Sequence, residues 1–207
     1  MHESKVEFVG NEPLFVTHES VNKLLIENKT DASAIRKDAL DLKSLEDVLN
    51  QHEMVEKAEV FVSIEGVLKA VIKQKTPIAR YAHNENTYYI DSQGGNMPLS
   101  ESYSARVPLI AGEQSKIATQ QVHDILMLIH EDEFLSVNII GVKVLSNGAL
   151  ELKNRGFEFD ILFGSPINGK EKFNNYKAFL QKAVGDSSVY QYKKIDLRFN
   201  NQVVCTK

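Results

Sequence analysis

The spacing of hydrophobic residues predicts a β-α-α-β-β order for the first 75 residues. Residues 5–9 have the alternation of a short strand. Two amphipathic stretches follow, one after Thr17 and one after Asp41, and both residue types favour the N-cap of a helix. Their apolar positions are Val21, Leu24 and Leu25, and then Leu42, Leu45, Val48 and Leu49. Apolar residues that recur every three to four positions indicate helices with one buried face.

A β-hairpin completes this first group of elements. Two runs alternate between apolar and polar residues, and their apolar positions are Ala58, Val60, Val62 and Ile64, and then Leu68, Ala70 and Ile72. Glycine tolerates the positive φ of a tight turn, so Glu65-Gly66 is expected to join the two strands. Pro77 follows shortly after and interrupts ladder pairing, which places a domain boundary near Thr76.

The rest of the chain predicts several strands and two helices. The expected strands are 88–90, 106–110, 137–140, 142–145, 150–153, 157–163 and 190–205, and the expected helices are 114–129 and a stretch around 173–180. Ser146-Asn147-Gly148 is a strong hairpin signal. The predicted fold class is therefore α+β, with a small β-α-α-β-β domain at residues 1–75 and a mostly antiparallel β domain with two helices at residues 76–207.

Charge and cysteine content exclude several classes of protein. The chain has 207 residues, with 24 basic and 28 acidic side chains and a net charge of −4. No cluster of Lys or Arg stands out, so we expect no nucleic-acid partner. A single cysteine, Cys205, cannot form an internal disulfide or a cysteine-rich zinc site. No run of about 18 apolar residues occurs that could span a bilayer.

One loop has the glycine and lysine spacing of a phosphate-binding motif. Gly164, Gly169 and Lys170 match it, but Glu171 stands where the motif needs Ser or Thr for magnesium. Pro166 also removes one N–H donor from the loop, and the preceding strand comes from an apparently antiparallel region. A strand-to-helix connection is the favoured interpretation. A nucleotide-binding enzyme that uses Gly164–Lys170 is kept as the alternative.

The other candidate chemistry is sparse, and we predict no catalytic residue, no metal site and no cofactor. His123 and His130 are two helical turns apart, about 10.5 Å, which is too far to share one metal ion. The acidic run that follows His130 is interpreted as a solvated loop, and Asp91 before Gly94-Gly95 as a turn-forming side chain. Ser165 lacks the flanking pattern of a nucleophile.

The last strand is the most distinctive feature of the pattern. From Ile195 to Cys205 the odd positions are mostly apolar and the even positions mostly polar. A strand at the end of a chain needs no onward connection and can lie at a sheet edge, where unpaired N–H and C=O groups form a template for a partner strand. A place inside the sheet, or an edge protected by its charges, is equally compatible with the pattern.

Five motifs in this order resemble the extracytoplasmic part of the FtsQ/DivIB bacterial cell-division proteins. The opening β-α-α-β-β unit is similar to their POTRA domain. The five matching segments are "KQKTPIAR" (73–80), "YYIDSQGGNMPLS" (88–100), "ARVPLIAG" (105–112), "ILFGSPINGKEKF" (161–173) and "YKKIDLRFNNQVV" (192–204). A third class, a POTRA-containing assembly or secretion factor, is disfavoured by the segments of the second half.

The resemblance implies a non-enzymatic divisome scaffold on the periplasmic face of the bacterial inner membrane, at the division site. It implies a single-pass protein whose membrane helix precedes residue 1, and as partners the small coiled-coil division proteins FtsB and FtsL. In the family, the last strand binds FtsB by β-strand addition. Four partner-binding residues carry over by motif match, Arg198, Phe199, Asn200 and Asn201, and four more by position, Gln202, Val203, Val204 and Cys205.

Overall fold

The structure is a computed structural model that describes residues 4–10, 15–31, 41–83, 86–185, 187–199 and 202–207. The chain forms two compact units. Unit 1 is Met1–Thr76 together with Met97–Ala105, and unit 2 is Pro77–Asn96 together with Arg106–Lys207. In the described ranges, no helix combines the length and the apolar character needed to cross a membrane.

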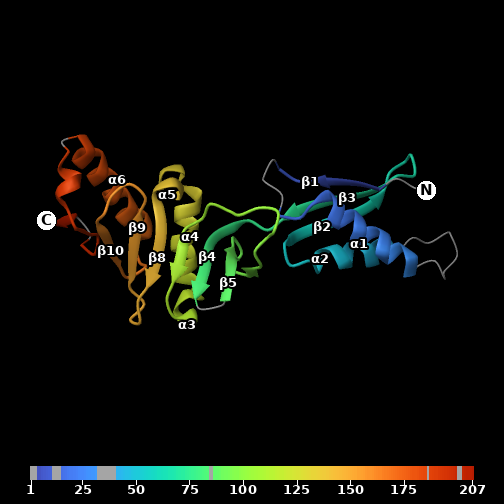
Figure 1. Ribbon diagram of the computed structural model, residues 1–207, viewed down its shortest axis with the longest axis horizontal. Coiled ribbons are helices and arrows are strands. Elements are labelled where there is room, and N and C mark those ends of the chain that lie inside the picture. Colours follow the sequence, from blue (N-terminus) through green and yellow to red (C-terminus); the bar gives the residue numbers. More distant parts are fainter. Residues whose placement is uncertain (1–3, 11–14, 32–40, 84–85, 186, 200–201) are drawn as a thin grey trace. The chain divides into compact units, whose positions relative to one another are not determined.

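Unit 1 has the predicted β-α-α-β-β order. Its elements are β1 (Ser4–Phe8), α1 (His18–Asp31), α2 (Leu42–Asn50), β2 (Val55–Val62) and β3 (Leu68–Gln74). The strands form a sheet in the order β1-β3-β2, with β1 parallel and β2 antiparallel to the central β3. Both helices cover one face of this sheet (Figure 1). Strand β3 is thus hydrogen-bonded on both sides, to β1 and to β2, and joins the two ends of the unit.

Two predicted helix caps are confirmed. The Thr17 hydroxyl accepts a hydrogen bond from the Ser20 N–H at 3.1 Å, and the Asp41 carboxylate accepts one from the Ser44 N–H at 3.0 Å. Each satisfies a backbone donor that the first turn of a helix leaves without a partner. The apolar helix faces pack on the sheet through Val21, Leu25, Leu45, Leu49, Val6, Val60, Ala70 and Ile72, among others.

The hairpin between β2 and β3 differs from the prediction. Strand β2 ends at Val62, and Ile64 lies fully exposed in the turn instead of extending the apolar face. The Gly66 N–H donates to the Ser63 carbonyl, and Ser63 bonds Val67 through both its main chain and its hydroxyl. Gly66 has φ of +81°. The turn therefore involves four residues, Ser63 to Gly66, because the local hydrogen bonds of Ser63 end the ladder early.

Residues 97–105 pack within unit 1, although they follow β5 in sequence. Met97 is fully buried, and the Ser100 hydroxyl donates to the Phe15 carbonyl at 2.8 Å. The rings of Phe15 and Tyr103 meet edge to face at 5.2 Å. Unit 1 thus includes a segment that is distant in sequence from its other elements.

Unit 2 is built on a nine-stranded sheet. Its elements are β4 (Pro77–His83), β5 (Asn86–Asp91), β6 (Asn96–Met97), β7 (Leu109–Ala111), α3 (Gln114–Ile117), α4 (Gln120–Glu131), α5 (Glu133–Asn138), β8 (Ile139–Val144), β9 (Leu150–Asn154), β10 (Asp160–Gly164), α6 (Gly169–Gly185), a 3₁₀ turn (Ser188–Gln191), β11 (Lys194–Asp196) and β12 (Val204–Thr206). The strand order is β12-β11-β10-β9-β8-β7-β4-β5-β6. The predicted α+β class is confirmed.

The sheet is mixed, with more parallel pairing than the sequence predicts. The pairs β4–β7, β7–β8 and β10–β11 are parallel. The pairs β4–β5, β8–β9, β9–β10 and β11–β12 are antiparallel. Parallel neighbours need a crossover connection, and here helical segments supply it between β7 and β8 and between β10 and β11.

The single helix predicted at 114–129 and the two strands predicted at 137–140 and 142–145 are wrong. Two helices, α3 and α4, replace the first, and α5 follows them. Thr119 caps α4 and Asp132 caps α5 through hydrogen bonds from the N–H groups of Val122 and Leu135. Helix α5 extends to Asn138, and one continuous strand, β8, follows. The acidic run after His130 is therefore a helix junction and not a solvated loop.

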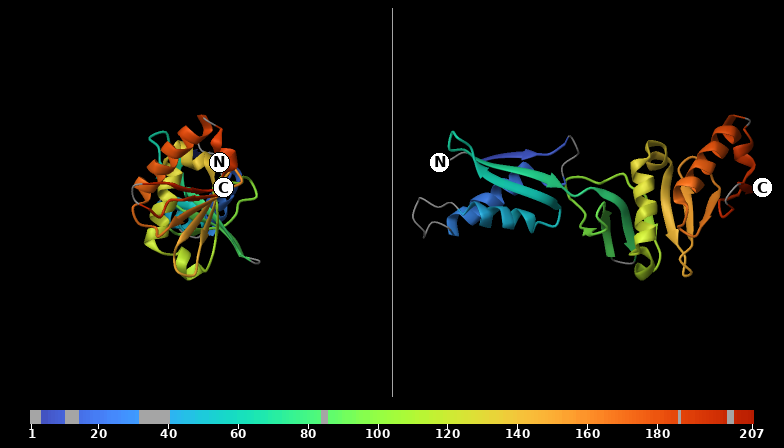
Figure 2. Two further views of the ribbon diagram at one scale, coloured as in Figure 1. Left: turned by 90° about the vertical axis from the view of Figure 1, so that its left-hand side faces the viewer. Right: turned by 180° about the vertical axis from the view of Figure 1, so that it is seen from behind.

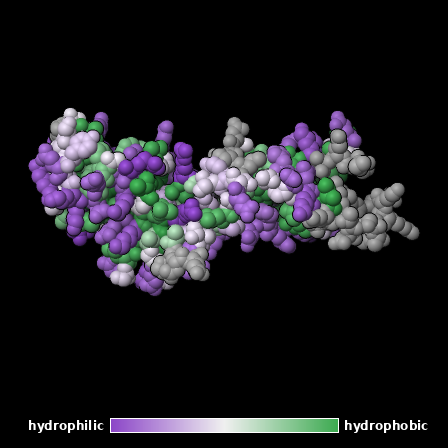
Figure 3. Space-filling view, viewed as in Figure 1, coloured by the Kyte–Doolittle hydropathy of each residue, from purple (hydrophilic) through white to green (hydrophobic). Residues whose placement is uncertain are grey.

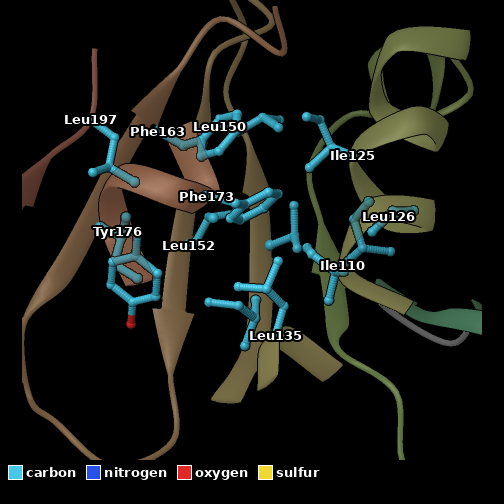
Figure 4. Packing of buried hydrophobic residues seen from close by; sticks show 14 of the residues in the cluster. Ile110, Ile125, Leu126, Leu135, Leu150, Leu152, Phe163, Phe173, Tyr176 and Leu197 are labelled. Atoms are coloured by element: carbon cyan, nitrogen blue, oxygen red, sulfur yellow. The ribbon is translucent and has the colours of Figure 1, made fainter. Parts of the chain in front are cut away.

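Helices α4 and α6 pack on one face of the larger sheet. Ile125 and Leu126 of α4 point toward Ile110 of β7, while Phe173 of α6 lies near Leu152 of β9 (Figure 4). The strands of this sheet are twisted relative to one another, as the left view of Figure 2 shows. On the face drawn in Figure 3, hydrophilic and hydrophobic residues are interspersed over the part of unit 2 around α6.

Tyr176 of α6 carries a buried hydroxyl without a hydrogen-bond partner among the described residues, and burial raises its pKa. We expect Tyr176→Phe to raise the free energy of unfolding by about 1 kcal/mol, because an unsatisfied buried polar group is removed. Chemical denaturation measures it, and Tyr190→Phe at an exposed ring is the control with no expected change. A loss of stability in Tyr176→Phe would contradict the prediction.

Candidate partner-binding edge

Strand β12 forms one edge of the nine-stranded sheet. It pairs antiparallel with β11, with Lys194 opposite Thr206, Ile195 opposite Cys205 and Asp196 opposite Val204. Strand β11 pairs on its other side with β10, in parallel. Within the described part of the chain, no strand occupies the second flank of β12. One side of its main chain is thus open.

The single long strand predicted from Ile195 to Cys205 is wrong. The chain leaves the ladder after Asp196 and returns as β12 from Val204. The physical reason is local, because the Asp196 carboxylate accepts a hydrogen bond from the N–H of Arg198 at 3.0 Å. Such a turn of an aspartate onto its own backbone competes with strand pairing. The sequence alternation continues across the break and therefore could not reveal it.

The hydrogen bonds of β11 determine which way the main chain of β12 faces. The Leu197 N–H donates to the Leu162 carbonyl of β10, and the Asp160 N–H of β10 donates to the Lys193 carbonyl. The Lys193 carbonyl and the Leu197 N–H thus face β10, whereas the Lys193 N–H donates to the Thr206 carbonyl of β12 at 2.7 Å. This alternation leaves Lys194 and Asp196 to bond to β12. Their partners Thr206 and Val204 face inward. Since main-chain groups alternate in direction along a strand, the N–H and C=O of Cys205 face the open side.

The predicted site residues divide between this strand and the loop before it. Val204 and Cys205 lie on β12, whereas Arg198, Phe199, Gln202 and Val203 lie between the strands, and Asn200 and Asn201 fall outside the described residues. The side chains of Val203 and Cys205 pack against the core, while those of Phe199 and Val204 are exposed. Burial raises the pKa of the Cys205 thiol.

Sequence reasoning missed Thr206, the last residue of β12. Its β-branched side chain continues the strand-like run Val203-Val204-Cys205 and was a usable signal. Lys207 lies directly after it, and its ammonium group contacts the Gln191 side chain at 2.7 Å.

An ion pair holds the turn at the end of β11. The Arg198 guanidinium contacts both carboxylate oxygens of Asp196, with its Nε at 2.9 and 3.0 Å. The Asp196 side chain is nearly buried, whereas that of Arg198 is largely exposed. The hydrogen bond from Arg198 lowers the pKa of the Asp196 carboxyl, and the same contact raises the pKa of Arg198. The guanidinium is thereby held in one orientation at the surface.

The Arg198 side chain packs directly against the backbone of Gly164. A Cβ at this position would stand 2.6 Å from the Arg198 Cγ, and Gly164 has φ of +73°. Only glycine fits both conditions without strain. The position of the Arg198 side chain after β11 thus depends on a glycine at the end of β10, 34 residues earlier in the sequence.

Lys172, which sequence analysis passed over, fixes the loop that follows Gly164. Its ammonium group donates to the carbonyls of Phe163 at 3.0 Å and Ser165 at 2.7 Å and lies 4.7 Å from the centre of the Phe163 ring. Burial lowers its pKa, while these acceptors and the aromatic face favour the charged form. A signal existed, because Lys172 falls on the helical repeat of the buried Phe173 and Tyr176.

The phosphate-loop interpretation can now be compared with geometry. Strand β10 pairs antiparallel with β9, as expected, but it also pairs in parallel with β11, to which α6 joins it. In the loop itself, however, two carbonyls converge on Lys172. Phosphate binding needs converging N–H donors. The backbone of Gly169 is also closely packed, because a Cβ there would stand 2.4 Å from the Ile125 Cδ1 of α4.

The remaining candidates have structural contacts. The Asp91 carboxylate accepts hydrogen bonds from the N–H groups of Gln93 and Gly95, as expected of a turn-forming residue. His123 lies 3.2 Å from the Ser92 carbonyl, and Asp132 bonds the Lys177 ammonium, which lowers the pKa of Asp132. In the described ranges, no group of three or more His, Cys, Asp or Glu is placed to hold a metal ion.

Comparison with known protein families gives a match over the second part of the chain. The model of the family described as FtsQ/DivIB, C-terminal related matches residues 76–206, well over half of the chain. This range contains all of the predicted partner-binding residues. No curated protein matches the chain.

Replacing Lys172 tests its role in the loop. We expect Lys172→Met to lower the free energy of unfolding by about 1–3 kcal/mol, because two carbonyls that it satisfies lose their partner. Lys170→Met, at an exposed position two residues earlier, should change it by less than about 0.5 kcal/mol. Urea denaturation of both variants measures this, and equal effects would show that Lys172 has no special role.

The Asp196–Arg198 pair predicts an acid-dependent stability. The folded-state pKa of Asp196 is lowered, so the stabilisation is present above its ordinary pKa of 3.8 and is lost as the pH falls through the folded value. Asp196→Asn should therefore be less stable than the natural chain at neutral pH, with the difference shrinking below pH 3.8. Thermal unfolding over this pH range measures it. Asp160→Asn, whose pairing with Lys153 is solvent-exposed, is the control, and a difference that persists in acid would refute the assignment.

Proposed function

We propose, because the chain belongs to the FtsQ/DivIB, C-terminal related family, that it is a cell-division scaffold that holds a partner polypeptide along the open flank of β12. The family is a non-enzymatic scaffold family of membrane-anchored division proteins with a periplasmic domain. The observation that carries the proposal is the place of β12 at the end of the strand order, with one neighbour only.

Strand addition is the binding mode that this edge favours. The Cys205 N–H and C=O face the open side, and a partner strand could exchange hydrogen bonds with them. Strand β12 has three residues, and short edge strands limit uncontrolled pairing between copies. A short template of this kind suits a dedicated partner whose side chains contribute the remaining affinity.

Exposed side chains beside the edge would select the partner. Phe199 and Val204 offer apolar surface, and Arg198 offers a guanidinium whose orientation Asp196 fixes. An oriented guanidinium suits a carboxylate of the incoming segment, because little conformational freedom is then lost on binding. We assign the FtsB/FtsL pair of coiled-coil division proteins as the partner, with the FtsB-type chain on β12.

The proposed location follows from the same family. The chain would lie on the periplasmic face of the bacterial inner membrane at the division septum, anchored by a helix that precedes residue 1. The β-α-α-β-β order of unit 1 supports its assignment as a POTRA-like module. Its partners would be other division proteins.

Proline at position 205 tests the main-chain contact. Cys205→Pro removes the outward N–H, which proline can do at a sheet edge without disturbing the inner ladder. We expect the affinity for the extracytoplasmic segment of the FtsB-type protein from the same genome to fall about five- to tenfold, the value of one lost hydrogen bond. Isothermal titration measures it.

Two controls separate the N–H from other effects. Cys205→Val keeps the N–H and should bind like the natural chain, whereas Val204→Pro removes an inward N–H and should lower the melting temperature. If Cys205→Pro binds the segment as tightly as Cys205→Val does, the open flank of β12 is not the docking edge.

A further inference from the structure

Three hydrophobic side chains are exposed at the turn end of the β2–β3 hairpin, two at the end of β2 and one in the turn. Phe61, Val62 and Ile64, called here the hairpin tip, have exposed fractions of 43%, 45% and 108%. Single exposed aliphatic residues are common on protein surfaces and need no explanation. Three of them within four residues, where β2 ends and the turn begins, point to a contact that unit 1 itself does not make.

Strand register places the start of β1 beside this tip. Ser4 is paired with Leu68, the first residue of β3 after the turn, and β1 runs parallel to β3 away from it. Leu68 is also paired with Val62, the last residue of β2. Ser4 and the hairpin tip therefore lie at the same end of the sheet.

Charged residues on the outer sheet face alternate in sign from one cross-strand row to the next, and the row nearest the tip is cationic. The cross-strand row next to the tip is Lys5, Lys69 and Phe61, and the following row is Glu7, Val71 and Glu59. The carboxylate of Glu7 contacts the Lys5 ammonium at 3.0 Å. The row beside the apolar residues thus carries two lysines, the next row carries Glu7 and Glu59, and the third row carries Lys57 and Lys73. Glu65 in the turn adds one negative charge close to the tip.

We propose that the hairpin tip inserts into the interfacial region of an anionic lipid bilayer, with Lys5 and Lys69 facing the headgroups. The inference rests on the proposed N-terminal membrane anchor, which would hold Ser4 and hence the tip near the bilayer. Apolar side chains flanked by lysines are the usual composition of surfaces that enter a membrane interface. The inserted tip would fix the orientation of unit 1 with respect to the membrane.

The size of the tip favours lipid over a protein as its occupant. Specific protein interfaces bury about 1,200–2,000 Å² and use a core of several residues on each side. Three side chains at a turn offer far less area, yet a bilayer needs no matching shape. Two or three partly inserted side chains give weak binding, which becomes effective once the chain is tethered to the same surface.

A single tryptophan reports insertion without background, because the chain contains none. The full 207-residue chain with Ile64→Trp carries an N-terminal hexahistidine tag and is tethered to vesicles of phosphatidylethanolamine and phosphatidylglycerol that contain a nickel-chelating lipid. We expect the fluorescence emission to shift to shorter wavelength and to be quenched by brominated acyl chains. Tyr190→Trp, at an exposed position of unit 2, is the control without shift or quenching.

Untethered chains measure the affinity itself. Phe61→Ser combined with Ile64→Ser should lower the partition coefficient onto the same vesicles about tenfold or more, because two apolar side chains no longer enter the interface. Glu65→Gln should raise it, and vesicles of neutral phosphatidylcholine should bind more weakly than anionic ones.

The outcomes separate this inference from the proposed scaffold function. Absence of both the shift and the quenching in tethered Ile64→Trp would overturn membrane insertion, while binding of the FtsB-type segment at β12 would be measured independently. If the Phe61→Ser, Ile64→Ser variant partitions like the natural chain, the tip is not the membrane contact. If it instead loses affinity for the FtsB-type segment, the tip is a protein contact and the lipid inference is wrong.

Discussion

The hydrogen bonds between Asp196 and Arg198 determine how the chain ends. By accepting the Arg198 N–H and holding its guanidinium, the Asp196 carboxylate stops β11 after three residues. The chain can then turn back and pair as β12 on the outer side of β11. If β11 continued straight to Cys205, the apolar Val203 and Cys205 would extend beyond the core instead of packing on it. The open flank of β12 is therefore a consequence of one local interaction.

That interaction depends in turn on the loop after β10. Arg198 can lie flat only because Gly164 has no side chain, and the Gly164 turn is held by Lys172, whose ammonium group satisfies the two carbonyls around it. Two stretches that look like separate motifs in sequence, around Phe163-Gly164 and Asp196-Leu197-Arg198, form one structural unit. The lysine and glycine spacing of the first stretch, which resembles a phosphate loop, is explained by packing and carbonyl pairing.

Local signals in the sequence predicted local features well. The caps at Thr17 and Asp41 and the turn at Asp91 follow from side chains that bond their own neighbourhood, and all three are present. The parallel pairing of β10 and β11 was missed because hydrophobic alternation says nothing about which strand is the neighbour. The end of β11 was missed for another reason, because the hydrophobic alternation continues across the local hydrogen bond from the Arg198 N–H to the Asp196 carboxylate. Asp132 was missed as a helix cap because it lies in a run of acidic residues, which was interpreted as a solvated loop.

The two proposed contacts, at β12 and at the hairpin tip, are each weak on their own and both depend on tethering. A three-residue edge offers very few main-chain hydrogen bonds, each with a net value of about 0.5–1.5 kcal/mol. Main-chain pairing alone therefore sets register and cannot provide tight binding, and most of the affinity must come from side chains such as Phe199 and Arg198. The hairpin tip likewise buries too little area to bind a membrane firmly by itself. Both contacts become effective when tethering raises the local concentration of the second surface, which is the situation of a scaffold anchored in a membrane.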